Sequence, residues 1–329
     1  MEFGKCSGEK RHYMRVAILE DYQKASPALA CFAKLAGHEV EVFSESMREE
    51  NVLALKLKEF EAWVLIRERT RITASLLDRV PKLKLIVQTA KIGPHVDVKA
   101  CQARGITVCD STGSPLSTAE LTWGLILAAA RGIAQENARL RSGLWQGSVG
   151  TQLAGRKLGF IGYGRIAQRL TRYAQAFEMQ VAVWGRNSTL AKAKEAGIQT
   201  FESLDLLCSE CDIVSVQLRL NPETRGIIKY RHLAQMKADA MFVNASRAEL
   251  VEAGALERAL REGRPGRAAL DVFENEPVMD AAHPVISLPN VTATPHLGFV
   301  ERGSYEKYFG DAFDAVNAFA AGKPVRVVP

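Results

Sequence analysis

The sequence predicts an α/β protein made of two lobes, each built on a parallel sheet. Short β-branched and apolar runs alternate with longer helical patterns, which is the signature of parallel α/β layers. These runs form two series, and a long apolar helix separates them. The last helical pattern, Ser304 to Ala321, has no strand series of its own to cover. It could return to the first lobe, which would make that lobe discontinuous.

The strands are expected where short apolar runs stand between helical patterns. The first series comprises Val16–Leu19, Glu39–Phe43, Trp63–Ile66, Leu83–Thr89 and Thr107–Asp110. The second comprises Lys157–Gly162, Gln180–Gly185, Asp212–Leu218, Met241–Ser246, Ala268–Phe273 and Val291–Pro295. The helix between them, residues 117–131, is expected to have Ser117 as N-cap, because Glu120 would complete a capping box. Most of its faces are apolar, so we expect it to be buried between layers or between subunits.

Length and charge are those of an ordinary globular protein of about two domains. The 329 residues carry a net charge of +6, with 37 acids mixed among 43 bases. No block of five Lys or Arg occurs, so the pattern favours a mildly basic surface over a nucleic-acid-binding one. The longest uncharged, mostly apolar run, Leu121 to Ala130, is about half as long as a membrane span. Residues 1–13 lack a signal-peptide pattern and are interpreted as an extension.

The six cysteines indicate a reducing compartment. Only Cys208 and Cys211 have motif spacing, and they lie at an expected helix end before the strand around Ile213. A redox pair instead opens the helix that follows a strand. We therefore expect a cytoplasmic protein without a metal site.

A glycine-rich turn follows the first strand of the second series. Gly162, Gly164 and Ala167 form the pattern G-x-G-x-x-A between a strand and a helical pattern. The first glycine permits a tight turn, the second lets the backbone approach a pyrophosphate, and the alanine lets helix and strand pack closely. The helix N-terminus would present N–H groups and a positive dipole end to the phosphates. The turn predicts dinucleotide binding.

The next strand ends without the acid that an NAD-selective site places there. Such a site holds an Asp or Glu about 20 residues beyond the glycine turn. Here Gly185 stands 23 residues beyond the first glycine, and no acid occurs within Val181–Leu190. A carboxylate would repel a 2′-phosphate, whereas Arg186, with Asn187 or Ser188, can bind one. The pattern favours NADP; the alternative is that Arg186 points to solvent and the protein uses NAD.

Three later strand ends carry reactive side chains. Arg247 follows one strand, Asp271 and Glu276 follow the next, and His296 follows the last. Ligands bind at the carboxyl ends of strands in open α/β sheets, so these groups could bind a carboxylate substrate and move a proton. Each also has a structural interpretation, as a helix-start residue, a turn aspartate, a solvated loop acid and a loop cap.

These segments together resemble the D-isomer-specific 2-hydroxyacid dehydrogenase family, which includes phosphoglycerate and glyoxylate/hydroxypyruvate reductases. The resemblance covers nearly the whole chain after Met14. It rests on GYGRIAQRL, VNASRAELVEAGALERAL, AALDVFENEP and TPHLG in the family's order and spacing, and on STAELTWGLILAAAR, which is similar to its helix between the lobes. It implies two Rossmann-like parallel-sheet lobes. A nucleotide lobe, 116–299, would be inserted in a discontinuous, flavodoxin-like substrate lobe, 14–115 and 300–329.

The resemblance also implies a mechanism. His296 would be the acid/base of hydride transfer between a 2-oxo and a 2-hydroxy acid, because imidazole changes charge near neutral pH. Glu276 would bind the other ring nitrogen, fix the tautomer and favour imidazolium. Arg247 would grip the substrate carboxylate with its planar fork. Asp271 would hold the carboxamide of the nicotinamide. The implied cofactor-binding residues are Thr118, Gly162, Gly164, Arg165, Ile166, Gly185, Arg186, Asn187, Leu218, Ala245, Ser246, Arg247, Asp271, His296 and Gly298.

The substrate loop departs from the family's glycine-rich pattern. The stretch TAKIGPHVD places Lys91, Ile92 and Gly93 beside the expected carboxylate site. Lys91 could add a second cation or could be a solvated loop lysine. Arg67, at another strand end, could reach the far end of the substrate. The substrate's side chain is not readable from these residues.

Formate dehydrogenases and transcriptional corepressors also use this fold. Formate dehydrogenase has a neutral amide at the position of Glu276, which disfavours it. Transcriptional corepressors resemble the family and bind peptide partners under nucleotide control, but this chain shows nothing like their added tails. We expect an enzyme that binds NADP or NAD and a small 2-oxo acid, without nucleic acid or membrane. The helix 117–131 and the segment around Trp145 are expected to bury the two-fold interface of a homodimer.

Overall fold

The computed structural model describes residues 12–329. Residues 1–11, which make up most of the predicted extension 1–13, lie outside the described residues. The chain forms two compact units. Unit 1 comprises residues 12–114 together with Glu301–Pro329, and unit 2 comprises Pro115–Val300. No helix of the described part combines the length and apolar character needed to cross a membrane.

Unit 1 is built on a five-stranded sheet whose strands are all parallel. The order β2-β1-β3-β4-β5 is that of flavodoxin-like folds. Helices α1 to α3 pack on one face through an apolar cluster that includes Leu57, Trp63 and Ile86. The strands are β1 (Arg15–Leu19), β2 (Glu39–Val42), β3 (Ala62–Leu65), β4 (Leu85–Gln88) and β5 (Thr107–Asp110), and the helices are α1 (Glu50–Leu57), α2 (Ala74–Leu77) and α3 (Val98–Ala103).

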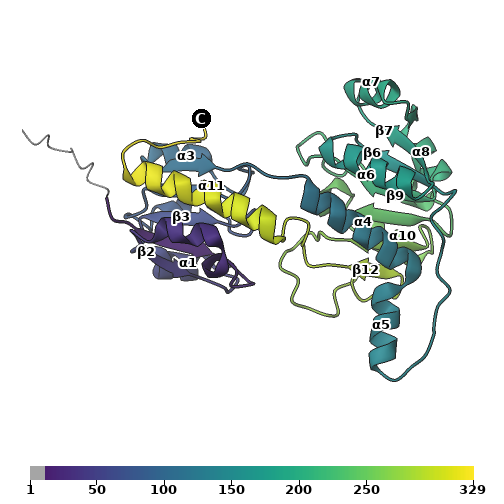
Figure 1. The fold of residues 1–329 in the computed structure, drawn as a ribbon, viewed down its shortest axis with the longest axis horizontal. Helices are drawn as coiled ribbons and strands as arrows, with labels where there is room; N and C mark the ends of the chain where they lie inside the picture. Colours follow the sequence, from purple (N-terminus) through teal and green to yellow (C-terminus); the bar gives the residue numbers. More distant parts are fainter. Residues whose placement is uncertain (1–11) are drawn as a thin grey trace, which may run out of the picture. The chain divides into compact units, whose positions relative to one another are not determined.

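The last helix belongs to unit 1, although the whole of unit 2 precedes it in the sequence. Helix α11 (Arg302–Ala320), the yellow helix of Figure 1, packs against β4 and a 3₁₀ segment, Ala30–Leu35. It begins two residues earlier than Ser304, because the Glu301 carboxylate accepts hydrogen bonds from the N–H groups of Gly303 and Ser304. A carboxylate N-cap also interacts favourably with the helix dipole.

Unit 2 holds a seven-stranded parallel sheet of order β12-β11-β10-β9-β6-β7-β8. Counted within the unit, this is the Rossmann order 3-2-1-4-5-6 with one further strand. The predicted fold class, two parallel-sheet α/β lobes, is confirmed. The strands are β6 (Lys157–Ile161), β7 (Gln180–Trp184), β8 (Gln199–Thr200), β9 (Ile213–Val216), β10 (Met241–Asn244), β11 (Arg267–Leu270) and β12 (Val291–Ala293).

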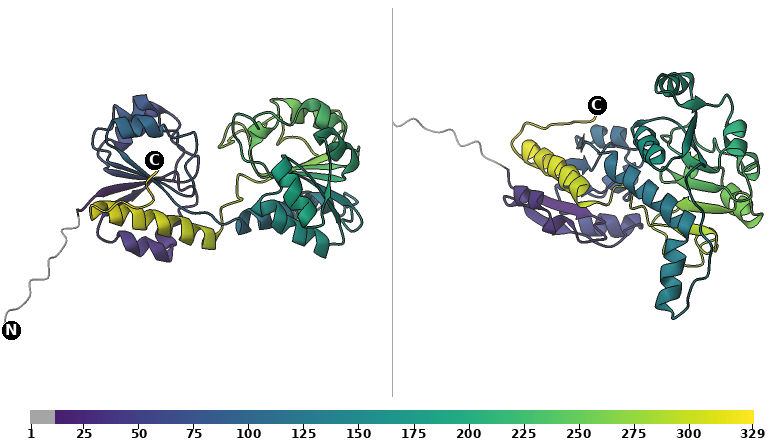
Figure 2. Two further views of the ribbon diagram at one scale, coloured as in Figure 1. Left: turned by 90° about the horizontal axis from the view of Figure 1, so that it is seen from above. Right: turned by 45° about the vertical axis from the view of Figure 1, so that its right-hand side comes forward.

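Apolar side chains cover both faces of this sheet, as a buried parallel sheet requires. Along β6, Phe160 faces one cluster and Ile161 faces the other. Figure 2 shows α4 and α6 on one side of the sheet and the helices that follow β9 and β10 on the other. The helices are α4 (Leu116–Arg131), α5 (Ile133–Arg141), α6 (Arg165–Ala176), α7 (Asn187–Glu195), α8 (Leu204–Glu210), α9 (Tyr230–Ala234) and α10 (Ala255–Arg261).

Helix α4 does not begin as the sequence predicted. Pro115 is the N-cap, and its carbonyl accepts the hydrogen bond of the Ala119 N–H. Ser117 is a buried residue inside the first turn, and no side-chain cap is made, so the predicted Ser117–Glu120 capping box was wrong. Proline is well suited to a helix start because it lacks the N–H that a first turn would leave unpaired.

The Cys208–Cys211 stretch lies at the end of α8, with Cys211 as C-cap. Burial raises the pKa of both thiols to about 12. Within residues 12–329, no cluster of three or more potential metal ligands occurs.

Candidate active site

The glycine turn lies where β6 passes into α6. Gly162 has φ +95°, and a Cβ there would lie 2.7 Å from the Gln217 carbonyl oxygen and 2.8 Å from Leu218 Cδ2. Gly164 is the N-cap of α6, and nothing in the protein lies within 4 Å of where its Cβ would be. The first glycine is therefore required by the fold, whereas the second leaves open space before a helix N-terminus. This is the arrangement expected of a pyrophosphate cradle.

The end of β7 gives Gly185 a packing role that the sequence did not predict. A Cβ at Gly185 would lie 2.8 Å from Thr189 Cγ2, because the first turn of α7 folds back over the strand end. Arg186 is the N-cap of α7, its carbonyl accepts from the N–H groups of Thr189 and Leu190, and the residue is exposed. Asn187 begins the helix. An acid at 185 would need Thr189 to move.

His296 and Glu276 form the central polar pair of unit 2. The Nδ1 atom of His296 lies 2.5 Å from Glu276 Oε2, and Glu276 Oε1 accepts a hydrogen bond of 2.9 Å from the Phe273 N–H. Both side chains are partly exposed, at 21% and 31%. The Phe299 ring stands edge-on to the imidazole, with centroids 5.5 Å apart. The pairing occupies Nδ1 and directs proton exchange of the ring to Nε2.

The turn that carries His296 is held by a buried carboxylate. His296 has φ +52°, a left-handed conformation that costs a non-glycine residue roughly 1–2 kcal/mol. Asp271 is fully buried and accepts hydrogen bonds from Thr294 Oγ1 (2.6 Å), the Leu297 N–H (2.7 Å) and the Gly298 N–H (2.8 Å). Burial raises the pKa of Asp271, and these bonds and His296 oppose that rise. The carboxylate thus fixes the turn, a contact that the sequence did not reveal.

Arg247 completes a row of groups that leave adjacent strands. Strands β10, β11 and β12 are neighbours in the sheet, and Arg247, Asp271 and His296 follow their respective carboxyl ends. Arg247 is partly buried, and its Nη1 donates to the Ser246 carbonyl at 2.6 Å. Ser246 in turn donates to the Val216 carbonyl at the end of β9. These residues lie along the carboxyl edge of the sheet, as does Ala245, which directly follows β10. Ligands of α/β proteins bind at this edge.

The predicted substrate residues of unit 1 lie at the carboxyl ends of β3 and β4. Lys91 Nζ donates to Asp110 Oδ1 at 2.7 Å, so the predicted second cation is neutralised by an acid at the end of β5. The Ile92 N–H points at the same carboxylate, at 3.4 Å. Arg67 has φ +55°, its N–H donates to Thr89 Oγ1, and its Nε lies 3.8 Å from the Glu68 carboxylate. A Cβ at Gly93 would lie 3.1 Å from His95 Nδ1.

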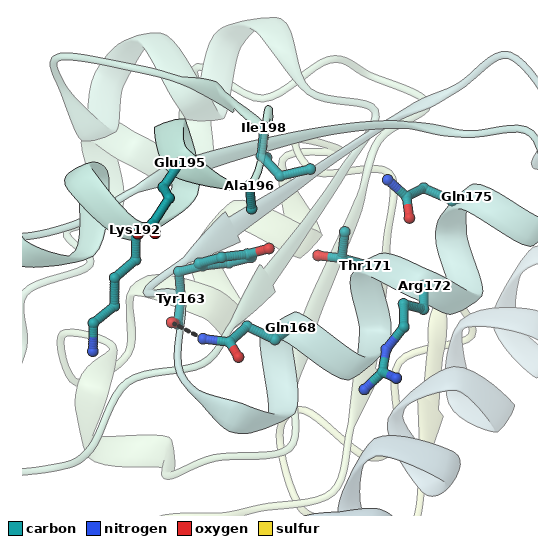
Figure 3. Close-up of a pocket in the computed structure, with 9 residues that line it drawn as sticks. All are labelled: Tyr163, Gln168, Thr171, Arg172, Gln175, Lys192, Glu195, Ala196 and Ile198. Carbon is teal, nitrogen blue, oxygen red and sulfur yellow. Dashed lines mark hydrogen bonds between the residues drawn. The ribbon is translucent and has the colours of Figure 1, made fainter.

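A separate hollow of about 500 Å³ lies between α6 and α7. Figure 3 shows the Tyr163 ring within it, with Arg172 and Lys192 among the side chains around it. Neither His296 nor Glu276 lines it. Most of its lining residues belong to α6 and α7, and Tyr163 comes from the glycine turn after β6.

The fold and these groups define a Rossmann-type protein with a dinucleotide-binding turn and a histidine–carboxylate pair on the same sheet. The family described as "D-isomer specific 2-hydroxyacid dehydrogenase, NAD binding domain" matches residues 123–298. The chain belongs to the D-isomer-specific 2-hydroxyacid dehydrogenase family, as the sequence predicted.

Individual relatives agree with this assignment. The chain is 38% identical to a D-3-phosphoglycerate dehydrogenase of Methanocaldococcus jannaschii over 79% of its length, and spans about half (49%) of that longer protein. It is 37% identical to a glyoxylate reductase of Aeropyrum pernix, covering 77% of this chain and 78% of the relative. A Ralstonia solanacearum structure described as a candidate D-3-phosphoglycerate dehydrogenase is 45% identical, with a TM-score of 0.94 over 96% of both chains.

Proposed function

We propose that this protein is an NAD(P)-dependent oxidoreductase that interconverts a 2-oxo acid and a D-2-hydroxy acid. Unit 2 would bind the dinucleotide, and unit 1 would contribute to substrate binding. The observation that carries the proposal is the hydrogen-bonded pair of His296 and Glu276, held on the same sheet edge as Arg247. Family membership supplies the reaction class.

The residues present fit a dinucleotide. Gly164 leaves open space in front of the α6 N-terminus, where Arg165 and Ile166 begin a helix of twelve residues with N–H groups that can bind phosphate. Gly185, Arg186 and Asn187 would contact the adenosine ribose. When bound, the nicotinamide supplies or accepts the hydride at the substrate's second carbon. Further contacts are proposed for Leu218, Ala245, Ser246, Asp271 and Gly298.

His296 is the proposed acid/base. In the reductive direction, its Nε2 gives a proton to the carbonyl oxygen of the 2-oxo acid, and in the oxidative direction it removes the hydroxyl proton. Glu276 accepts the Nδ1 hydrogen bond, which fixes the tautomer and stabilises the imidazolium form. The three hydrogen bonds to Asp271 hold the left-handed turn that carries the ring.

Arg247 is the proposed substrate anchor. The planar fork of its guanidinium matches a carboxylate in a bidentate geometry that lysine lacks. A cation beside the 2-oxo group also polarises the carbonyl and stabilises negative charge on its oxygen. Arg67, Ile92 and Gly93 stay candidates for contacts with the distal part of the substrate. Lys91 would contribute little net charge while it pairs with Asp110.

A substrate panel tests the proposed function. Glyoxylate, hydroxypyruvate and longer 2-oxo acids are assayed with NADH and with NADPH by loss of reduced-cofactor absorbance, and the product's configuration is determined. Turnover of at least one acid to a D-2-hydroxy product is expected. Tight dinucleotide binding without turnover of any acid would contradict the proposal and favour a nucleotide-sensing binding protein.

The described cysteines are all free thiols, which supports the proposed cytoplasmic location.

A further inference from the structure

The chain passes between the two compact units twice, at Ser114–Pro115 and at Val300–Glu301. On the unit 2 side, a hydrogen bond links the segments beside these two passages. Thr118 Oγ1, in the first turn of α4, donates to the Gly298 carbonyl at 2.9 Å. Both residues stand within four positions of a passage. Two segments that are 180 residues apart in sequence are thus fastened together beside both passages.

Gly298 fills a slot between Asp271 and Thr118. A Cβ on Gly298 would lie 3.1 Å from Asp271 Oδ2 and 3.4 Å from Thr118 Cγ2. Asp271 accepts the Gly298 N–H at 2.8 Å, while Thr118 donates to the carbonyl of the same residue. Both backbone polar groups of Gly298 are therefore held by side chains from different elements.

His296 lies two residues before Gly298 and has the left-handed backbone described above. Asp271 accepts the Leu297 and Gly298 N–H groups of this turn, and Thr118 donates to the Gly298 carbonyl. If only one of these two partners held the turn, the turn could move relative to the rest of unit 2. A shift of about 1 Å at a catalytic group can lower the rate about 100-fold.

We propose that Thr118 is a positioning residue for the acid/base. Its hydroxyl clamps the His296 turn to the start of α4, so the catalytic turn and the first turn of α4 form one rigid element of unit 2. The inference rests on the proposed function of His296. It differs from the cofactor contact expected of Thr118, because a positioning residue affects the chemical step and a contact residue affects dinucleotide affinity.

Three variants separate these roles. Thr118→Val removes the hydroxyl and keeps the shape of the side chain, and Thr118→Ser restores the hydroxyl. Thr122→Val is the matched control on the same helix, since the Thr122 hydroxyl donates only to the Thr118 carbonyl within α4. Hydrogen exchange of the peptide spanning 294–300 is measured by mass spectrometry, together with kcat, KM, the pH profile and the Kd of the reduced dinucleotide.

Thr118→Val should speed exchange of the 294–300 amides about tenfold, as expected for loss of one hydrogen bond. It should also lower kcat about tenfold or more and leave the Kd within twofold. Thr118→Ser and Thr122→Val should behave as wild type. Gly298→Ala crowds the same slot and should reproduce the effects of Thr118→Val if that variant does not fold.

Wild-type exchange in Thr118→Val, or a loss confined to dinucleotide Kd, would overturn the proposal. If the wild-type protein turns over no 2-oxo acid, the proposed function fails, and the exchange measurement still decides whether Thr118 clamps the turn.

Discussion

His296 Nδ1 and Glu276 Oε2 lie 2.5 Å apart, although 20 residues separate them in the chain. The two residues follow β12 and β11, which are neighbours in a parallel sheet, so the loops after these strands leave the same edge. The pair therefore depends on sheet order and on the buried Asp271 that holds the turn. It is the part of the molecule on which the chemical predictions rest.

Replacement of the histidine should abolish most of the turnover. His296→Gln removes the group that exchanges a proton with the substrate oxygen, and kcat should fall at least about 100-fold, the usual contribution of acid–base catalysis. Dinucleotide Kd should stay within threefold. His283→Gln, on the loop between the same two strands, is the control histidine and should keep wild-type kcat. A His296→Gln variant with undiminished turnover would remove this residue from the mechanism.

Glu276→Gln should lower the rate of the reductive reaction. The amide keeps a hydrogen bond to His296 Nδ1 but loses the negative charge beside the ring. That charge would stabilise the ring in its role as acid/base, so kcat should fall when it is removed. The measurement is kcat in the reductive direction. An undiminished kcat would show that the carboxylate charge does not assist the acid.

Two glycines of the same turn should respond differently to alanine. At Gly162 a Cβ would clash with the Gln217 carbonyl at 2.7 Å and φ is +95°, so Gly162→Ala should lower thermal stability. At Gly164 no protein atom lies within 4 Å, so Gly164→Ala should keep the Tm of the apoprotein. It should still weaken dinucleotide binding about tenfold or more, because the methyl group occupies the space of the pyrophosphate. Calorimetry and cofactor titration decide between these outcomes, and equal Tm losses would refute the distinction.

A buried histidine outside the site should make stability depend on pH. His232 is 4% exposed, and its Nδ1 accepts a hydrogen bond from the Lys229 N–H. Burial lowers the pKa of His232 below its ordinary 6.5, although the negative charge of Asp205 acts to raise it. Lys229, Arg231 and Glu252 are the other charges around it. Below about pH 6.5 the unfolded chain takes up a proton that the folded ring resists. The free energy of unfolding should therefore fall as pH drops through 6.5 toward the folded pKa.

His232→Gln tests this assignment. Glutamine at the third position of α9 can still accept the Lys229 N–H, as in a capping box, but it does not titrate. Urea unfolding at pH 7.5, 6.5 and 5.5 should show a smaller loss of stability on acidification in the variant than in wild type. The same loss in both proteins would assign it to other groups.

The alternation of apolar and helical runs was enough to predict every strand except β8. That strand has two residues, Gln199 and Thr200, and pairs only with β7, so it leaves too short a pattern to recognise. The start of α4 was predicted wrongly because Pro115 competes with Ser117 for the N-cap, and only the three-dimensional path decides between them. The local sequence is therefore enough to predict the strands and helices that form the layers. The exact ends of these elements depend on tertiary structure.

The candidate site divides in the same way. The glycine turn is a local motif and could be predicted from the sequence. The positions of the reactive residues at strand ends could be predicted in the same way. The salt bridge of Lys91 with Asp110 and the three hydrogen bonds to Asp271 join residues that are far apart in the chain. No local pattern encodes such pairings. The left-handed backbone of His296 was equally hidden, because a histidine rarely adopts it without such support.

Unit 2 should associate with a second copy. Helix α5 buries none of its residues, and apolar side chains are exposed on it and on the segment after it: Ile133 54%, Leu140 60%, Leu144 50%, Trp145 74% and Val149 99%. Several exposed apolar side chains on one segment are typical of an interface, and two-fold dimers are the commonest assembly. Light scattering at micromolar concentration should show a dimer that Trp145→Glu weakens. Leu55→Glu, at a similarly exposed apolar residue of unit 1, is the control and should leave the dimer intact. A monomeric wild-type protein would contradict this prediction.

The choice of dinucleotide should follow from the end of β7. A Cβ at Gly185 would lie 2.8 Å from Thr189 Cγ2, so an acid at this position would meet a steric conflict and would also repel a 2′-phosphate. Arg186 is exposed at the N-terminus of α7, where its charge and the helix N–H groups favour a 2′-phosphate. We expect a higher kcat/KM with NADPH than with NADH.

Arg186→Ala should lower kcat/KM for NADPH about tenfold or more, since charge-assisted bonds to the 2′-phosphate are lost, and leave NADH within twofold. Arg172→Ala, an exposed arginine of α6 beside the hollow in Figure 3, is the matched control and should alter neither value. The double variant Gly185→Asp with Thr189→Ala removes the steric conflict and adds a carboxylate that repels the phosphate and binds the ribose hydroxyl. It should reverse the preference toward NADH. A wild-type preference for NADH, or an equal loss with both cofactors in Arg186→Ala, would show that Arg186 points to solvent and does not select the cofactor.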